Sequence, residues 1–149
     1  MPGLLVAAGG DRPGPYMVQF NGLDSTKEMV YGTGPAQQYL ARGISTLIID
    51  QPGTGETLRL NGIAEAERCG AACIDYLTER RDCDPEHIGV GGWSLGGYFA
   101  PRRAAFEPRF ELCAAWGAIY DAAYRPFLSA QAVKGYRQIV ESVTAVRWS

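Results

Sequence analysis

The sequence predicts an α/β fold, a mainly parallel sheet with helices on both faces. From residue 4 onward, short apolar runs alternate with longer amphipathic patterns, which is typical of strands joined by crossover helices. The clearest strand is 44–50 (ISTLIID), which is apolar almost throughout, as expected for a strand covered on both faces. The clearest helix is 63–77, where apolar residues recur every three or four positions.

The other elements follow the same alternation. Ser25 and Glu28 have the spacing of a capping box, which predicts that a helix begins near residue 26. This helix extends to about residue 42 and has glycines and a proline near its middle. Strands are predicted at 4–8, 16–20, 88–92 and 112–118, and further helices at 95–106 and 129–146.

Composition limits the classes of protein to which the chain can belong. Its 149 residues correspond to one domain, and 46% hydrophobic with 20% charged residues is typical of a globular protein. A net charge of −2, with no basic run, argues against nucleic acid as a partner. The longest apolar runs reach less than half of the ~18 residues that cross a bilayer, and the N-terminus lacks a basic signal-peptide region. We therefore expect no membrane association and a cytoplasmic location.

Cysteine and histidine counts limit the chemistry further. The four Cys residues show no CxxC spacing, so buried free thiols are a better interpretation than a zinc site. No other spacing implies a metal or an organic cofactor. The single histidine restricts which hydrolytic mechanisms the chain can complete alone.

A GxSxG pattern at residues 92–96 predicts a nucleophile elbow, with Ser94 at a strained turn between a strand and a helix. The pattern alone arises often by chance in a glycine-rich chain. Here a predicted strand precedes it and a predicted helix follows it, which is the context the elbow requires. The alternative is a serine that merely caps the helix or forms a turn.

A serine nucleophile also requires donors for an oxyanion. The backbone N–H of Leu95, directly after the nucleophile, meets one requirement by position. The second donor is expected from Leu23 or Asp24, in the loop after strand 16–20. The same loop can equally be an ordinary turn in which Asp24 and Ser25 cap the next helix, and both roles can hold together.

Four ordered motifs, NGLDSTKE, DQPGTGE, GVGGWSLGGYFAPR and AAWGAIYD, resemble the α/β-hydrolase superfamily. The similar branch contains 2,6-dihydroxypseudooxynicotine hydrolase and the fungal polyketide-shortening hydrolases. The resemblance implies a serine hydrolase with an Asp and a His completing a triad, a helical lid, and cleavage of an ester or of a C–C bond next to a carbonyl. It assigns Ser94 as nucleophile and the Leu95 and Leu23/Asp24 amides as oxyanion hole.

The triad cannot be completed from this sequence alone. His87 precedes Ser94 and the intervening strand separates them by up to roughly 20 Å, whereas the family places the His last in the chain. Asp121 is a possible acid, although a hinge or capping role for the lid is preferred. We therefore expect residues 1–149 to be a partial catalytic domain, truncated before its final strands, with 122–149 beginning the lid.

Two functional hypotheses follow. The first is a serine hydrolase that acts on a small ester or ketone substrate and is incomplete here because its catalytic His is missing. The second is a noncatalytic α/β remnant that serves as a binding or interaction module. In either case an exposed sheet edge could pair with a second copy of the chain.

Overall fold

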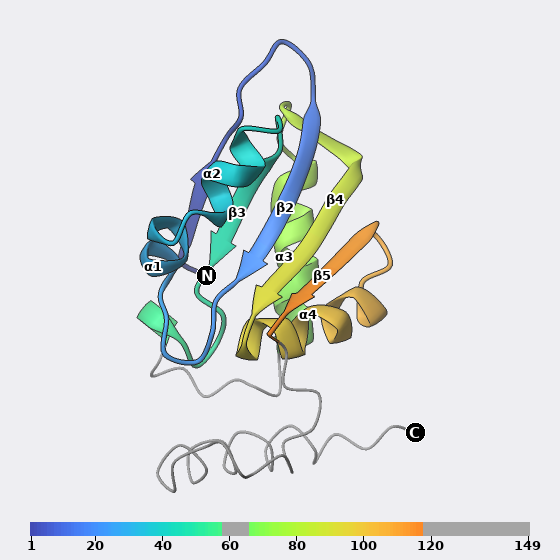
Figure 1. Cartoon of the computed structure of the whole chain (residues 1–149). Coiled ribbons are helices and arrows are strands. Elements are labelled where there is room, and N and C mark those ends of the chain that lie inside the picture. The colour runs from blue at the N-terminus through green and yellow to red at the C-terminus, as the bar shows by residue number, and fades with distance from the viewer. Residues whose placement is uncertain (58–65, 118–149) are drawn as a thin grey trace, which may run out of the picture.

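Five strands form one sheet in the computed structural model, which describes residues 1–57 and 66–117. The spatial order is β1-β3-β2-β4-β5. β1 is antiparallel to β3, and all other neighbours are parallel (Figure 1). The strands are β1 (Gly3–Val6), β2 (Gly14–Phe20), β3 (Ser45–Ile49), β4 (Cys83–Trp93) and β5 (Leu112–Trp116). The predicted α/β architecture is confirmed.

Helices cover both faces of the sheet (Figure 1). Val30 of α1, Ala36 of α2 and Ile48 of β3 form a small core on one face. On the other face, α3 and α4 pack on the larger core, to which β2 contributes Tyr16 and Phe20. The helices are α1 (Lys27–Gly32), α2 (Pro35–Leu40), the 3-10 turn η1 (Gly55–Thr57), α3 (Ala66–Thr78) and α4 (Leu95–Phe106).

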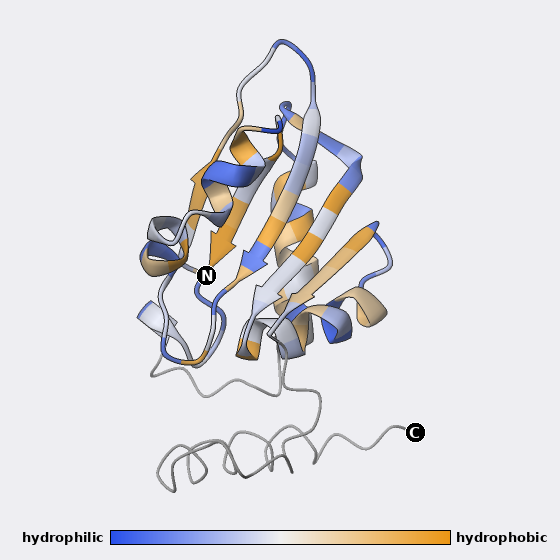
Figure 2. Ribbon diagram, in the orientation of Figure 1, coloured by the Kyte–Doolittle hydropathy of each residue, from blue (hydrophilic) through white to orange (hydrophobic). Residues whose placement is uncertain are grey.

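Burial on both faces explains the apolar residues of β3, Leu47, Ile48 and Ile49. All five residues are buried, and adjacent ones point to opposite faces. Leu47 and Ile49 belong to the larger core, whereas Ile48 belongs to the smaller one. The strand is accordingly hydrophobic along most of its length in Figure 2. A strand between two helical layers needs apolar side chains on both faces, which is the reason that the prediction succeeded.

The helix predicted over 26–42 is instead two short helices. Gly34 lies between them with φ of +97°, a conformation that a residue with a Cβ rarely adopts. The capping-box prediction was wrong by one residue, because Thr26, not Ser25, is the N-cap and accepts a hydrogen bond from Met29 N at 3.3 Å. Ser25 Oγ accepts instead from the backbone N–H of Gly22.

The parallel strands end together at one edge of the sheet. Phe20, Ile49 and Gly92 are in register across β2, β3 and β4, so the loops that follow these strands are neighbours. In open α/β sheets, ligands bind outside the carboxyl ends of the strands. This edge is therefore where a site is expected.

Three further predictions can be compared with the structure. Cys69, Cys73 and Cys83 are buried as expected, and burial raises the pKa of Cys73 to about 12. Cys113 is exposed, contrary to the prediction, because it lies on β5, an edge strand among the described residues. Within residues 1–57 and 66–117, no helix is long and apolar enough to span a bilayer. In the same residues, no three His, Cys, Asp or Glu side chains gather closely enough to hold a metal ion. The predicted helix 129–146 and the lid region lie outside the described residues.

Candidate active site

Ser94 occupies a sharp turn between β4 and α4. Its φ of +56° is the one positive value among the described non-glycine residues, and its ψ is −114°. Such a conformation costs about 1–3 kcal/mol and persists only where the surroundings enforce it. Here the Ser94 N–H donates to Trp116 O of β5 at 3.0 Å, and Ser94 O accepts from Tyr98 N in α4 at 3.0 Å. The turn is thus held from both sides.

Glycines make this turn possible. A Cβ atom on Gly92 would overlap the carbonyl group of Gly96. A Cβ atom on Gly96 would lie 2.7 Å from the carbonyl oxygen of Asn21, closer than real Cβ atoms approach. On Gly97 it would lie 2.8 Å from Trp116 O. The helix after Ser94 therefore packs directly on the ends of β2 and β5, which is a stronger reason for the glycines than the pattern alone supplied.

The loop between β2 and α1 lies against Ser94. A Cβ atom on Gly22 would stand 3.4 Å from Ser94 Cβ, so the two residues are in contact distance. The Gly22 N–H is already engaged, because it donates to Ser25 Oγ at 2.8 Å. This leaves the amides of Leu23 and Asp24, the two predicted donors, as the next ones along the loop. The Leu23 side chain packs on Leu95 and Phe99, which fixes one side of the loop on α4.

The Leu95 N–H is the first of α4. The first four N–H groups of a helix make no hydrogen bond within it, so this donor is available beside Ser94. The structure thus brings Ser94, Leu95 and the 22–25 loop together at one edge of the sheet.

A cavity of about 330 Å³ opens beside Ser94. One wall is the 22–25 loop and another is α1, while Trp93, stacked on Trp116 with ring centres 5.6 Å apart, supplies an aromatic surface. Most of the lining is apolar. The lining residues are Gly22, Asp24, Ser25, Met29, Val30, Thr33, Trp93 and Ser94.

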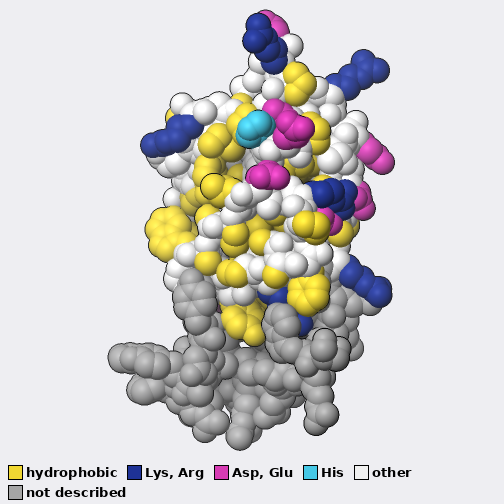
Figure 3. Space-filling view, turned by 90° about the vertical axis from the view of Figure 1, so that its right-hand side faces the viewer, with side chains coloured by type: hydrophobic (Ala, Val, Ile, Leu, Met, Phe, Trp, Pro, Cys, Tyr) yellow, Lys and Arg dark blue, Asp and Glu magenta, His cyan; other side chains and the backbone are white. Residues whose placement is uncertain are grey.

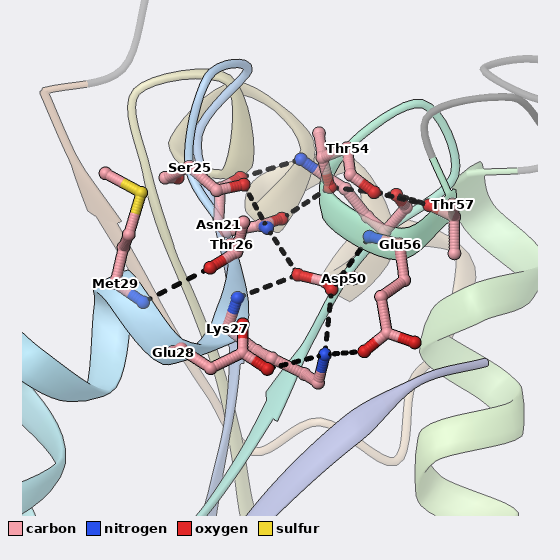
Figure 4. Close-up of polar contacts among 11 residues, drawn as sticks. Asn21, Ser25, Thr26, Lys27, Glu28, Met29, Asp50, Thr54, Glu56 and Thr57 are labelled. Carbon is pink, nitrogen blue, oxygen red and sulfur yellow. Dashed lines mark hydrogen bonds and ion pairs between the residues drawn. The ribbon is translucent and has the colours of Figure 1, made fainter.

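Beneath the loop lies a buried polar network centred on Asp50, the residue that follows β3 (Figure 4). Its carboxylate accepts from Asn21 Nδ2 at 2.8 Å and from the Lys27 N–H at 2.8 Å. Lys27 Nζ lies 3.2 Å from Asp50 Oδ2 and also contacts Glu28 and Glu56. Hydrogen bonds to Glu28, Glu56 and Asp50 raise the pKa of Lys27 despite its burial, and Lys27 lowers that of Glu28 to about 2. The buried lysine is therefore charged.

Arg103 extends the network into α4. It is fully buried, although it lies on the same helix as the apolar residues Leu95 and Phe99 and therefore needs polar or aromatic partners. Its guanidinium lies 3.6 Å from the centre of the Phe20 ring and donates to Gln51 Oε1 at 2.7 Å. Gln51 Nε2 in turn donates to the Asn21 carbonyl at 2.7 Å. The elbow helix and the loop after β2 are thus linked through the loop after β3.

No family model matches the chain. It is 38% identical over 116 residues to 2,6-dihydropseudooxynicotine hydrolase from Paenarthrobacter nicotinovorans. The aligned region covers 77% of this chain and 31% of that protein. It is also 38% identical over 114 residues to hydrolase acrC from Aspergillus aculeatus, covering 72% of this chain and 26% of that one. The crystal structure of 2,6-dihydroxy-pseudo-oxynicotine hydrolase superposes with a TM-score of 0.83 at 31% identity, over 95% of this chain and 42% of the other.

The chain belongs to the α/β-hydrolase family. Another solved structure, Est1E from Butyrivibrio proteoclasticus with ferulic acid, shares the fold with a TM-score of 0.69 at 17% identity, over 78% of this chain and 48% of Est1E. The chain spans about a quarter to a third of the length of these curated relatives. The resemblance inferred from the four motifs is confirmed.

The only histidine of this α/β-hydrolase chain stands far from Ser94. His87 lies within β4, six residues before the last residue of the strand, whereas Ser94 directly follows that last residue. Its side chain is 67% exposed and its Nδ1 lies 2.8 Å from Asp84 Oδ2. In Figure 3 the histidine lies next to acidic side chains on the surface. Asp121, the possible catalytic acid, lies outside the described residues.

Sequence reasoning missed the roles of Asn21, Gln51 and Arg103 in this α/β-hydrolase site. Each is a polar side chain that follows a strand or lies on the apolar face of a helix. Each is buried, so its hydrogen-bond partners fix the positions of the neighbouring loops. The available signal was Asp50 itself, because a carboxylate placed directly after a fully buried strand must find partners.

Proposed function

We propose that this chain carries the nucleophile and oxyanion hole of a serine hydrolase. The observation that supports the proposal is the strained Ser94 turn, with a free helix N–H on one side and the 22–25 loop on the other. A serine held in this way exposes Oγ to a substrate while its backbone is fixed. The relatives that match the chain are themselves named hydrolases.

In this mechanism Ser94 Oγ attacks a carbonyl carbon of the substrate and passes its proton to a general base. The carbonyl oxygen becomes an oxyanion, which the N–H groups of Leu95 and of Leu23 or Asp24 stabilise. Collapse of the intermediate breaks the bond to an alkoxide or, next to a second carbonyl, to a stabilised carbanion, and the leaving group takes up the proton. Water then hydrolyses the acyl-enzyme. Either an ester or a C–C bond next to a carbonyl fits this sequence of steps.

The general base is not His87, because a base must approach the serine hydroxyl to about 3 Å or through one water. We propose that the base, a histidine by analogy with the family, lies outside these 149 residues. The apolar lining of the cavity, with Met29, Val30 and the stacked Trp93, favours a small substrate that has an apolar or aromatic acyl group.

Ser94→Ala tests the proposal in the protein as its gene encodes it. With p-nitrophenyl acetate and with a 1,3-diketone as substrates, we expect at least one to be hydrolysed and Ser94→Ala to lose at least about 1,000-fold in kcat. Ser45→Ala is a suitable control because Ser45 begins β3, at the end of the sheet remote from Ser94, where its Oγ accepts a hydrogen bond from Ala8 N. Retained activity in Ser94→Ala would show that the nucleophile is assigned wrongly.

The distance between His87 and Ser94 also favours a second candidate, a noncatalytic module that keeps only the scaffold. On this alternative Ser94 is not activated, and the edge of β5, which no described strand pairs with, binds a second copy through Leu112 and Trp116. An unreactive Ser94 together with a dimer in light scattering would support this alternative. A reactive Ser94 would exclude it.

A further inference from the structure

The carboxylate of Asp50 joins the two ends of the loop that carries the candidate oxyanion donors. Asn21 directly precedes this loop and Lys27 directly follows it. Asp50 Oδ1 accepts from Asn21 Nδ2 and from the Lys27 backbone N–H, both at 2.8 Å (Figure 4). We propose that Asp50 is a positioning residue, which holds residues 22–26 beside Ser94, where the N–H groups of Leu23 and Asp24 are the candidate oxyanion donors. This inference rests on the proposed function.

Asp50 holds Asn21 in a network in which both polar side-chain atoms of Asn21 form hydrogen bonds. Asn21 Nδ2 also donates to Ser25 O at 2.7 Å, and its Oδ1 accepts from Thr54 Oγ1 at 2.7 Å. The Asn21 carbonyl accepts from Gln51 Nε2. Every polar side-chain atom of Asn21 has a partner, and all but one of these partners belong to the segment that begins at Asp50. The path of the loop is therefore set by the segment after β3.

The site around the carboxylate is closed to water. Asp50 is 0% exposed, and its Oδ2 accepts from Glu56 N at 3.1 Å and from Lys27 Nζ. Gly55 has φ of +48° and packs so closely that a Cβ there would overlap the carboxylate. Hydrogen bonds to a charged group in such surroundings are stronger than in water, so the loop is held firmly.

Asp50 does not itself act on substrate. It is absent from the lining of the cavity beside Ser94, and its whole surface is covered by protein. Its effect on the reaction must therefore pass through Asn21 and Lys27 to the loop. We therefore expect that loss of the Asp50 carboxylate weakens stabilisation of the transition state more than binding of the substrate.

Asp50→Asn tests this role, because it keeps the shape and replaces one acceptor oxygen by an amide that faces N–H donors. Removing one oxyanion donor typically costs 10²–10³ in kcat, and a displaced loop should cost less, about 10- to 100-fold. With a fluorophosphonate, we expect the maximal rate of Ser94 labelling to fall by that factor while the half-saturating concentration changes less than about twofold. Phenylboronic acid, which forms a tetrahedral adduct with the serine, should bind more weakly by a similar factor.

Asp82→Asn is the matched control. Asp82 is also a paired carboxylate, with Arg80 Nη2 at 2.8 Å and the Tyr16 hydroxyl at 2.9 Å, but it lies before β4 at the opposite end of the sheet. We expect its labelling rate to match that of the wild type. If Asp50→Asn does not fold, Thr54→Val removes the hydroxyl that donates to Asn21 Oδ1 with little change in volume, and should slow labelling about threefold to tenfold.

The outcomes separate this inference from the proposed function. Labelling of the wild type with equal rates in Asp50→Asn, or in Thr54→Val where the first does not fold, would overturn the positioning role and leave the nucleophile intact. A rise in the half-saturating concentration with an unchanged maximal rate would also overturn it. No labelling of wild-type Ser94 would instead reject the proposed function on which the inference depends.

Discussion

Close packing of backbone on backbone distinguishes Gly96 from most other glycines of the chain. Its α-carbon faces the carbonyl oxygens of Phe20 and Asn21, at the point where α4 meets the end of β2. Because backbone cannot move aside as a flexible side chain can, any Cβ here must displace the helix or the strand. The glycine is required by the fold at this position, and the Ser94 turn depends on it.

Gly96→Ala is therefore expected to lower the free energy of unfolding by roughly 3 kcal/mol or more. Gly32→Ala is the control, because Gly32 ends α1 and a Cβ there meets nothing within 4 Å. That substitution should be neutral or stabilising by up to about 1 kcal/mol. Urea denaturation measures both, and equal effects of the two substitutions would refute this description of the turn.

Residue types alone predicted the turn at Ser94 but not the buried polar residues that hold the neighbouring loops. Ser94 and its flanking glycines could be predicted because a steric requirement restricts the residue types that fit such a turn. Asn21 and Gln51 could not be predicted as parts of the site, because an amide side chain fits many environments. These residues find their partners only because the loops after β2 and β3 meet each other and α4 in the fold.

At the level of elements, two adjacent hydroxyl residues before α1 have different roles. Thr26 caps the helix through Met29 N, while Ser25 Oγ holds the Gly22 N–H. Both residues are hydroxyls next to each other, so sequence alone favoured the one that stands three residues before Glu28. The structure assigns the cap to one residue and the loop to the other.

Thr26→Ala should lower the free energy of unfolding by about 0.5–1 kcal/mol, because the cap is lost, with little change in the reactivity of Ser94. Ser25→Ala should instead slow fluorophosphonate labelling of Ser94, because the Gly22 N–H loses its acceptor within the loop. The pair is compared by thermal unfolding and by labelling rate. The reverse pattern, with Ser25→Ala affecting only stability, would show that the predicted capping box was right in effect.

The end of α4 carries a pH-sensitive contact. Arg109 forms ion pairs with Glu107, the C-cap of α4, at 2.7 Å and with Asp75 of α3 at 2.8 Å. Hydrogen bonding to Arg109 lowers the pKa of Glu107 below its ordinary value of 4.5. A carboxyl whose pKa is lower in the folded state stabilises the fold above its ordinary pKa, and this stabilisation is lost as pH falls below it.

We therefore expect the stability of the protein to decline as pH is lowered from about 5 through and below 4.5. In Glu107→Gln the decline should be smaller, because one of the responsible carboxyls is gone. Urea denaturation between pH 7 and pH 3 gives the two curves. Parallel curves for the variant and the wild type would show that Glu107 does not contribute to the pH dependence.

At the scale of the whole molecule, the alternation of strands and helices predicted the sheet and its two helical layers well. Continuous burial makes β3 recognisable, and the three- to four-residue period does the same for α3. Strand order was not predicted, because it depends on how the crossovers pack. The described residues nevertheless place the ends of β2, β3 and β4 side by side, where the candidate site forms.

In the described residues a strained turn at Ser94 lies beside a loop held by a buried carboxylate, and we propose that these form a nucleophile elbow and an oxyanion loop. The chain spans only about a quarter to a third of the length of its curated relatives. We propose that Ser94 is the most reactive serine of this chain.

Mass spectrometry after treatment with a fluorophosphonate tests this claim most directly. In the protein as its gene encodes it, we predict a single adduct, on the peptide that contains Ser94, with no adduct in Ser94→Ala. Absence of the adduct in the wild type, or an adduct of equal yield in Ser94→Ala, would contradict the assignment of Ser94 as the nucleophile.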